Sequence, residues 1–302
     1  GSEMCIRDRN KVEEAKAVLK KLISKYHITL ISLGNGTASR ESEQVIVELL
    51  KEIPVKVQYI IVNEAGASVY SASKLATEEF PNFDVGQRSA ASIARRLQDP
   101  LAELVKIDPK AIGVGQYQHD MNQKRLGEAL GGVVENCVNS VGVDLNTASP
   151  SLLAYVAGIN KTVSKNIITY REENGKFNTR KELLKVPKLG AKAFEQCAGF
   201  LRITDGDNVL DNTSVHPESY KAAAQLLKHM GYTEQDVQDG TVADLKQRLS
   251  KENTHKLAEE LGIGEITLKD IADSIIKKGR DPREELPQPV LRSDILSMED
   301  LK

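Results

Sequence analysis

The chain has 302 residues, of which 40% are hydrophobic and 28% are charged, and its formal net charge is −2. This length predicts two or three domains, and the near-balanced charge excludes a uniformly basic, histone-like protein. No run of eighteen apolar residues is present, so we expect no membrane-spanning helix and no membrane partner.

Cysteine usage gives no sign of a metal or a cofactor. Cys5, Cys137 and Cys197 lie far apart and form no C-x-x-C pair, so they predict neither a zinc site nor a disulfide framework. A reduced, cytoplasmic setting fits this pattern. Residues 1–10 are charged rather than apolar and begin with Gly-Ser, which is typical of a cloning remnant rather than a signal peptide. We expect this leader to lie outside the fold.

Residues 11–62 predict a small α/β layer. Helical spacing of apolar residues covers 11–26 and 40–52, and short apolar runs at 28–33 and 57–62 predict buried strands. Helices that alternate with strands indicate a parallel sheet. Because two strands make a poor sheet, the sheet is either truncated or has its other strands before residue 11.

Two features follow the predicted strands. The first strand ends at Gly34-Asn35-Gly36-Thr37, where a nucleotide-binding loop would lie, but the full glycine spacing and the lysine of such loops are missing. The second strand ends at Asn63-Glu64, a position typical of a metal-binding carboxylate. One acid does not make a two-metal site, and a surface or capping role for Glu64 is the simpler interpretation.

The sequence pattern from residue 67 to residue 139 predicts helices, and residues 141–146 lead into the next unit. Asp99-Pro100 and Asp108-Pro109 mark breaks, residues 113–120 form a polar loop, and residues 122–140 predict one long helix.

A doubled unit occupies residues 147–204. Its apolar residues recur at an interval of thirty: Leu153, Val156 and Ile159 in the first half match Leu183, Val186 and Leu189 in the second. Each half predicts a short helix, a tight turn and a second helix, which is the helix-hairpin-helix pattern. The first amides of a helix lack internal partners and attract anions, and glycine lets a phosphate approach the turn. In place of the ideal glycines stand Asn160 in the first turn and Lys188 in the second.

Charge supports a polyanion ligand for this unit. Residues 147–204 carry ten Lys or Arg against four Asp or Glu, a balance of +6, whereas the rest of the chain sums to −8. Such a basic island is an electrostatic footprint for nucleic acid; a helical bundle with a solvated basic face is the alternative. The predicted nucleic-acid-binding residues are Gly158, Ile159, Asn160, Lys161, Lys165, Lys176, Arg180, Lys188, Gly190 and Lys192.

Residues 205–302 are acidic, with thirteen basic and twenty acidic residues. Short amphipathic stretches predict a helical domain over 205–280, and a Pro- and charge-rich segment over 281–302 is typical of a linker. A third copy of the hairpin sequence motif is present at Leu261-Gly262-Ile263-Gly264, but acidic residues flank it. We therefore expect this third copy to be structural.

Six separate stretches resemble the bacterial Tex family of transcription accessory proteins: residues 33–41, 63–71, 95–101, 112–120, 193–202 and 215–220. The resemblance covers about residues 11–302. It implies a mainly α fold with a small α/β part: a partial, ribonuclease-H-like YqgF domain over 11–108, a helical connector over 109–146, the tandem helix-hairpin-helix over 147–204 and a helical domain over 205–280. It also implies binding of DNA or RNA without strong sequence preference, and contacts with the transcription machinery.

The chain departs from a full Tex protein. It lacks the N-terminal helical region, the first YqgF strands and the C-terminal OB-fold domain, so the resemblance implies an internal fragment in which 281–302 leads to an absent domain. The missing first strand carries the first metal-binding Asp of ribonuclease-H-like nucleases. We therefore predict no catalytic residues and no enzyme activity. Two alternatives stay open: a metal-dependent nuclease or resolvase that uses Glu64 and Asp99, and a protein-interaction scaffold in which acidic residues 205–302 dock a basic partner.

Overall fold

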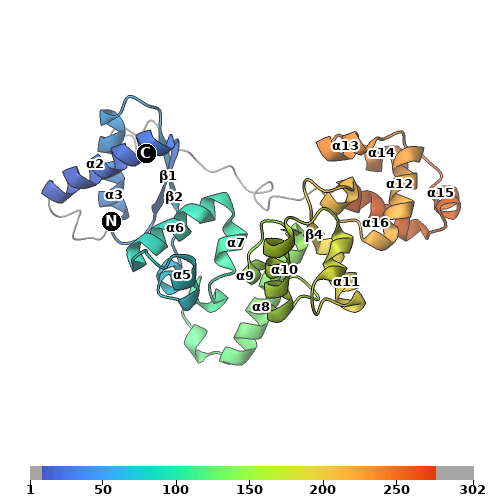
Figure 1. Cartoon of the computed structure of the whole chain (residues 1–302), viewed down its shortest axis with the longest axis horizontal. Helices are drawn as coiled ribbons and strands as arrows, with labels where there is room; N and C mark the ends of the chain where they lie inside the picture. The colour runs from blue at the N-terminus through green and yellow to red at the C-terminus, as the bar shows by residue number, and fades with distance from the viewer. Residues whose placement is uncertain (1–8, 277–302) are drawn as a thin grey trace. The chain divides into compact units, whose positions relative to one another are not determined.

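The computed structural model describes residues 9–276 (Figure 1), which divide into an N-terminal unit, residues 9–127, and a C-terminal unit, residues 128–276. Most of the expected leader and all of the expected linker over 281–302 lie outside the described residues. The predicted fold class, mainly α with a small α/β part, is confirmed. No helix within residues 9–276 combines the length and the apolar character needed to cross a bilayer.

The N-terminal unit begins with the predicted α/β layer. Its elements are α2 (Arg9–Tyr26), β1 (Leu30–Gly34), α3 (Ser39–Glu52) and β2 (Gln58–Val62). The two strands are parallel, with Leu30 opposite Gln58 and Gly34 opposite Val62, as the alternation of helices and strands predicts. Buried apolar side chains from both helices and from β2 form the core of this layer, among them Ile23, Ile46, Leu49 and Tyr59.

Short helices complete the N-terminal unit: α4 (Ala67–Ser71), α5 (Lys74–Glu79), α6 (Val85–Gln98), α7 (Pro100–Leu104), and the 3-10 turns at Pro109–Ala111 and Gln118–Asp120. The longest of them, α6, contacts β1 and α4. It begins with a capping box in which the Asp84 carboxylate accepts the Gln87 amide and the Gln87 side chain accepts the Asp84 amide, an arrangement that satisfies two otherwise free donors. Helix α8 (Gln123–Val141) leads into the C-terminal unit.

The doubled unit contains α9 (Pro150–Leu153), α10 (Lys161–Asn174), α11 (Ala191–Cys197), and 3-10 turns at Arg180–Lys185 and Ala198–Phe200. A pair of two-residue strands frames it: β3 (Val143–Asp144) pairs in parallel with β4 (Leu201–Arg202). Local sequence patterns do not predict this pairing, because its partners lie almost sixty residues apart. It ties the entrance of the doubled unit to its exit.

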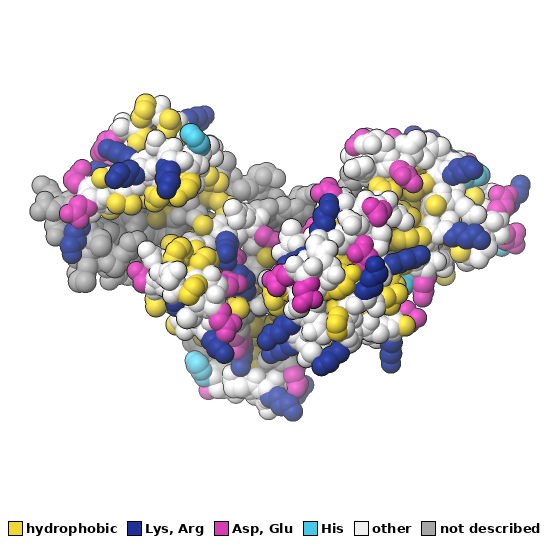
Figure 2. Space-filling view, in the orientation of Figure 1, with side chains coloured by type: hydrophobic (Ala, Val, Ile, Leu, Met, Phe, Trp, Pro, Cys, Tyr) yellow, Lys and Arg dark blue, Asp and Glu magenta, His cyan; other side chains and the backbone are white. Residues whose placement is uncertain are grey.

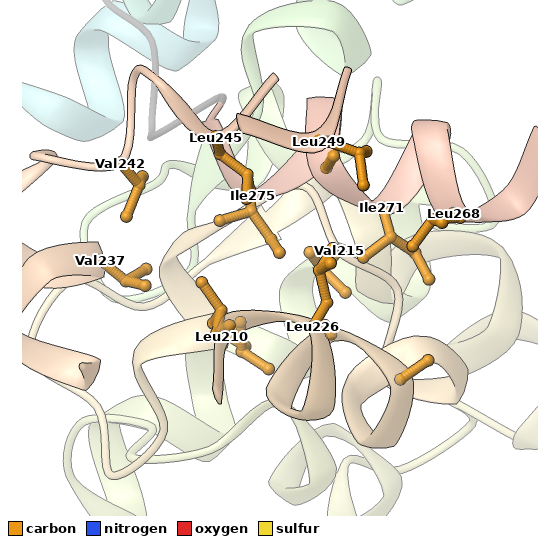
Figure 3. Close-up of a cluster of buried hydrophobic side chains, with 14 of the residues drawn as sticks. Leu210, Val215, Leu226, Val237, Val242, Leu245, Leu249, Leu268, Ile271 and Ile275 are labelled. Carbon is orange, nitrogen blue, oxygen red and sulfur yellow. The ribbon is translucent and has the colours of Figure 1, made fainter. Parts of the chain in front are cut away.

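A separate apolar core lies under the last helices, which are α12 (Tyr220–His229), α13 (Glu234–Asp239), α14 (Leu245–Leu249), α15 (Thr254–Leu261) and α16 (Glu265–Ile276). Figure 3 shows Leu226, Leu245 and Ile275 pointing toward one another in this core. The third hairpin copy ends α15 with Gly262 at φ +68°. Its Leu261 and Ile263 side chains pack against the same core, which agrees with a structural role.

Candidate nucleic-acid interface

Both halves of the doubled unit fold into the same turn. In the first, Gly158 has φ +80° and the Ile159 amide donates to the Val156 carbonyl at 3.0 Å. In the second, Lys188 has φ +65° and the Leu189 amide donates to the Val186 carbonyl at 3.2 Å. The repeated apolar residues anchor the two turns and are buried in both halves: Leu153, Val156, Ile159, Leu183, Val186 and Leu189.

Each hairpin packs against a helix of the other half. A Cβ on Gly158 would lie 2.7 Å from Gln196 Cβ and 3.1 Å from the Ala193 carbonyl oxygen, both on α11. On the other side, the Asn166 side chain of α10 donates to the Pro187 carbonyl at 2.8 Å. Gly158 is therefore needed for its left-handed φ and for the close approach of α11. The space left by its missing side chain is taken by α11 and not, as expected from the sequence, by a phosphate.

The two second helices differ in how their first amides are satisfied. Asn160 caps α10, because its Oδ1 accepts the amides of Thr162 at 3.0 Å and Val163 at 2.9 Å. Gly190 precedes α11 and supplies no side-chain cap. The donors at the start of α11 are therefore less occupied than those at the start of α10.

Ile159 does not fit the predicted role of a contact residue. Its side chain is 5% exposed and its amide already bonds within the turn. The prediction for Ile159 is wrong because this position anchors the hairpin from inside. Gly158, Asn160 and Gly190 are exposed, and their contact with nucleic acid stays a prediction.

The ten basic residues of the doubled unit separate into a surface group and an internal group. All seven lysines are exposed, and among residues 9–276 none of them forms an ion pair. All three arginines instead bond inward: the Arg171 guanidinium donates to the carbonyls of Leu145 and Ala148, and Arg180 and Arg202 are buried. Figure 2 shows Lys and Arg side chains, in dark blue, on the surface over α10 and α11.

Arg180 is a second correction to the predicted site. Its side chain is 1% exposed, and its guanidinium donates to the carbonyls of Leu201 at 2.8 Å and Val215 at 2.7 Å and to the Tyr220 hydroxyl at 2.8 Å. It also donates to the Thr213 carbonyl. Arg180 therefore joins the doubled unit to the chain that follows it and presents no group to a phosphate.

Arg202 continues this buried polar layer. It donates to the Gly199 carbonyl at 2.6 Å and to Ser214 Oγ at 2.8 Å. Gly142, at φ +84°, leaves room for the guanidinium, since a Cβ there would lie 3.0 Å from Arg202 Cζ. Burial and the neighbouring Arg180 guanidinium lower the pKa of Arg202 to about 9, because a charged group is costly in a poorly solvated site.

Lys176 lies away from the other predicted lysines. Helix α10 runs from Lys161 to Asn174, which is roughly 20 Å along its axis, and Lys176 follows its far end. Lys161 and Lys165 lie on the first turns of α10, and Lys192 lies on the first turn of α11. Lys188 follows Pro187, whose carbonyl accepts the Asn166 side chain of α10. Those four form the basic edge of the hairpins.

Asp99 caps a helix. The nuclease alternative assigned it, with Glu64, to a metal site. The Asp99 carboxylate accepts the Ala102 amide at 3.0 Å and begins α7. Residues 9–276 contain no group of three His, Cys, Asp or Glu side chains arranged to hold a metal ion.

Comparison with known proteins accounts for most of the chain. Residues 4–98 match the Tex protein YqgF-like domain, residues 138–202 a helix-hairpin-helix motif, and residues 208–283 a helix-hairpin-helix domain. The chain is 54% identical over 268 residues to the transcriptional accessory protein Tex of Neisseria gonorrhoeae, which covers 88% of this chain. Residues 4–98 thus carry a Tex-type YqgF domain, and homologues over most of the chain are named Tex.

Other similar proteins include the uncharacterized protein YdcI of Bacillus subtilis, 57% identical over 97% of the chain, and the human S1 RNA-binding domain-containing protein 1, 40% identical over 94%. The chain spans 40% of the YdcI length, 35% of the Neisseria Tex length and 34% of the human length. The third hairpin copy lies within the second helix-hairpin-helix match, although acidic residues surround it.

Proposed function

We propose that the chain binds the sugar-phosphate backbone of DNA or RNA, without reading base sequence, through the two hairpins of residues 147–204. The observation that carries this proposal is a repeated turn flanked by exposed lysines that have no acidic partner among residues 9–276. Lysines without partners are free to neutralise phosphates and release counterions. The match of residues 138–202 to a helix-hairpin-helix motif supports the same function.

Within this function, the two hairpins contribute differently. At the second hairpin, the amides at the start of α11 have no side-chain cap. In the proposed complex these amides, together with Lys188 and Lys192, contact the phosphates. Lys161 and Lys165 extend the basic edge along α10. Contacts of this kind position a protein on the backbone and carry no sequence information, so the proposed binding is nonspecific. It includes no catalytic step.

The names of relatives support a setting in transcription. One is a transcriptional accessory protein and another an S1 RNA-binding domain-containing protein. We propose that this chain is part of a transcription accessory factor, whose partners are nucleic acid and the transcription machinery. A cytoplasmic setting stays a prediction.

A salt titration tests the function directly. Binding of the chain to two duplexes of unrelated sequence, measured by fluorescence anisotropy, should give the same Kd at each salt concentration. The logarithm of the association constant should fall linearly with the logarithm of salt concentration, with a slope of about −3 to −4 if the four lysines of the basic edge each neutralise one phosphate. Parallel titrations with single-stranded DNA and RNA identify the preferred backbone. A strong sequence preference, or an affinity independent of salt, would contradict the proposal.

Asn160→Asp separates folding from binding at the first hairpin. Asp caps a helix about as well as Asn, so the free energy of unfolding should change by less than about 0.5 kcal/mol. The added negative charge beside a bound phosphate should weaken binding about five- to tenfold, on the order of 1 kcal/mol. Asn174→Asp, at the far end of α10, is the matched control and should bind as the unaltered chain does. Equal affinities of the two variants would remove the first hairpin from the interface.

A further inference from the structure

A second candidate site lies at the carboxyl ends of β1 and β2, in the N-terminal unit. Because the strands are parallel, the loops that follow them meet at one edge of the sheet, where open α/β sheets bind ligands. The loops are tied together: the Asn35 amide donates to the Val62 carbonyl at 3.1 Å, and Asn35 Oδ1 accepts the Glu64 amide at 3.1 Å. The glycine loop and Glu64 lie about thirty residues apart in the sequence, and only the fold joins them.

The Glu64 carboxylate lies directly against the two glycines. A Cβ on Gly36 would be 1.7 Å from Glu64 Oε1, and a Cβ on Gly34 would be 2.2 Å from Oε2. The backbone around Glu64 is held from behind by Arg96, whose Nη1 donates to the carbonyls of Asn63 at 2.8 Å and Ala65 at 2.9 Å. The glycines therefore make room for a carboxylate of the protein itself, in the place where a nucleotide phosphate would otherwise approach.

This carboxylate has no hydrogen-bond or ion-pair partner among the described residues, although it interacts through space with the charge of Arg96. Within residues 9–276 the Glu64 side chain accepts no hydrogen bond and forms no ion pair, and the Arg96 guanidinium is directed to backbone carbonyls instead. Glu64 lines a cavity of about 1040 Å³, and none of the described lining residues is Lys, Arg or His. The other acid of the lining, Asp84, is already engaged with the Gln87 amide at 2.7 Å. The described lining thus carries two carboxylates and no cationic side chain, and the charge of Glu64 is offset only through space by the Arg96 guanidinium.

We propose that this cavity binds an organic cation, an ammonium or guanidinium group, through the Glu64 carboxylate. Charge-assisted hydrogen bonds to a carboxylate are the strongest that such groups make, and the seryl hydroxyls of Ser32, Ser39 and Ser42 in the lining offer further acceptors. A phosphate would meet the carboxylates of Glu64 and Asp84, and the described lining offers it no Lys, Arg or His side chain. A divalent cation prefers several oxygen ligands held together, and the described residues provide no such cluster.

The two sources of such a cation are a free polyamine and a basic side chain of a peptide, and calorimetric titration of the chain distinguishes them. The probes are spermidine, Nα-acetyl-arginine amide, magnesium chloride and inorganic phosphate. Spermidine, the arginine amide, or both should bind, and the tighter of the two identifies the source. Binding of magnesium or phosphate with neither organic cation would overturn the proposal.

Two variants with a matched control locate the site. Glu64→Gln keeps the shape of the side chain and should weaken binding at least about tenfold, because the charge is lost. Glu41→Gln removes the same charge from the exposed first turn of α3, outside the cavity lining, and should leave the affinity unchanged. Equal affinities of the Glu64→Gln and Glu41→Gln variants would refute the assignment.

Gly36→Ala keeps every charge and moves only the carboxylate. The new methyl group would overlap Glu64 Oε1, so the carboxylate must shift and the affinity should fall about fivefold or more. Circular dichroism checks that each variant is folded. A further measurement needs no variant: in the unaltered chain, the amide chemical shifts of Asn35 and Glu64 should change when the cation is added. If these shifts do not change, the cation binds elsewhere. This site lies in the N-terminal unit, so its test is independent of nucleic-acid binding.

Discussion

Reversing four lysines at the hairpins, Lys161→Glu, Lys165→Glu, Lys188→Glu and Lys192→Glu together, is expected to lower the affinity for nucleic acid about a hundredfold or more. Each lysine is exposed and lacks an acidic partner among residues 9–276, so each is free to contact a phosphate. Reversal both removes the attraction and introduces repulsion. Fluorescence anisotropy at fixed salt measures the loss, and the slope of the salt titration should approach zero.

The control reverses the same number of charges elsewhere in the C-terminal unit. Lys176, Lys181, Lys221 and Lys228 are exposed and lie outside the basic edge of the hairpins, so their joint reversal changes the net charge identically. The control variant should lose only the modest, long-range part of the attraction, which 0.15 M salt screens beyond about 8 Å. If both variants lose affinity equally, binding follows net charge and the hairpins are not the interface.

Arg180→Met is expected to destabilise the C-terminal unit by about 3–5 kcal/mol. The substitution removes the Arg180 donor from the carbonyls of Thr213 and Val215, and each unsatisfied buried acceptor costs about 1–3 kcal/mol. Urea unfolding followed by circular dichroism measures the change. Hydrogen exchange of the amides in residues 201–215 should rise in parallel, because the segment loses its anchor.

Lys181→Met is the neighbouring control, since Lys181 is exposed and its loss should change stability by less than about 0.5 kcal/mol. Comparison of the two variants also separates structure from binding. If the Arg180→Met variant keeps its stability but loses affinity for nucleic acid, Arg180 contacts nucleic acid and its internal structural role is contradicted.

Local patterns predicted the features that depend on neighbouring residues. Apolar spacing is enough to predict strands at 28–33 and 57–62, because a buried strand needs only a short run of apolar residues. The thirty-residue interval between Leu153 and Leu183 predicts two hairpins for the same reason: each turn is built from a few consecutive residues. The turn closes through a hydrogen bond from the Ile159 amide to the Val156 carbonyl. The repeat therefore predicted the hairpin correctly but wrongly included Ile159 among the residues that contact a phosphate.

Charge counts are weaker guides, because they do not tell a surface cation from an internal one. Arg180 and Lys181 are adjacent in the sequence, yet one is buried among carbonyls and the other is exposed. The planar guanidinium can satisfy several carbonyls at once, and the carbonyls that it meets come from residues 201–215, which are distant along the chain. The basic excess at the surface of the doubled unit is therefore carried by lysines alone.

By itself the sequence determined the fold class, the resemblance to Tex proteins, the two hairpins and the basic character of their segment, since each of these rests on residue types at short, regular intervals. The tertiary structure alone decided that α11 packs on Gly158, that β3 pairs with β4, that the arginines point inward, and that Glu64 lies against the glycine loop. All of these depend on contacts between residues far apart in the chain, and the geometry of such contacts arises only when the helices and strands pack together.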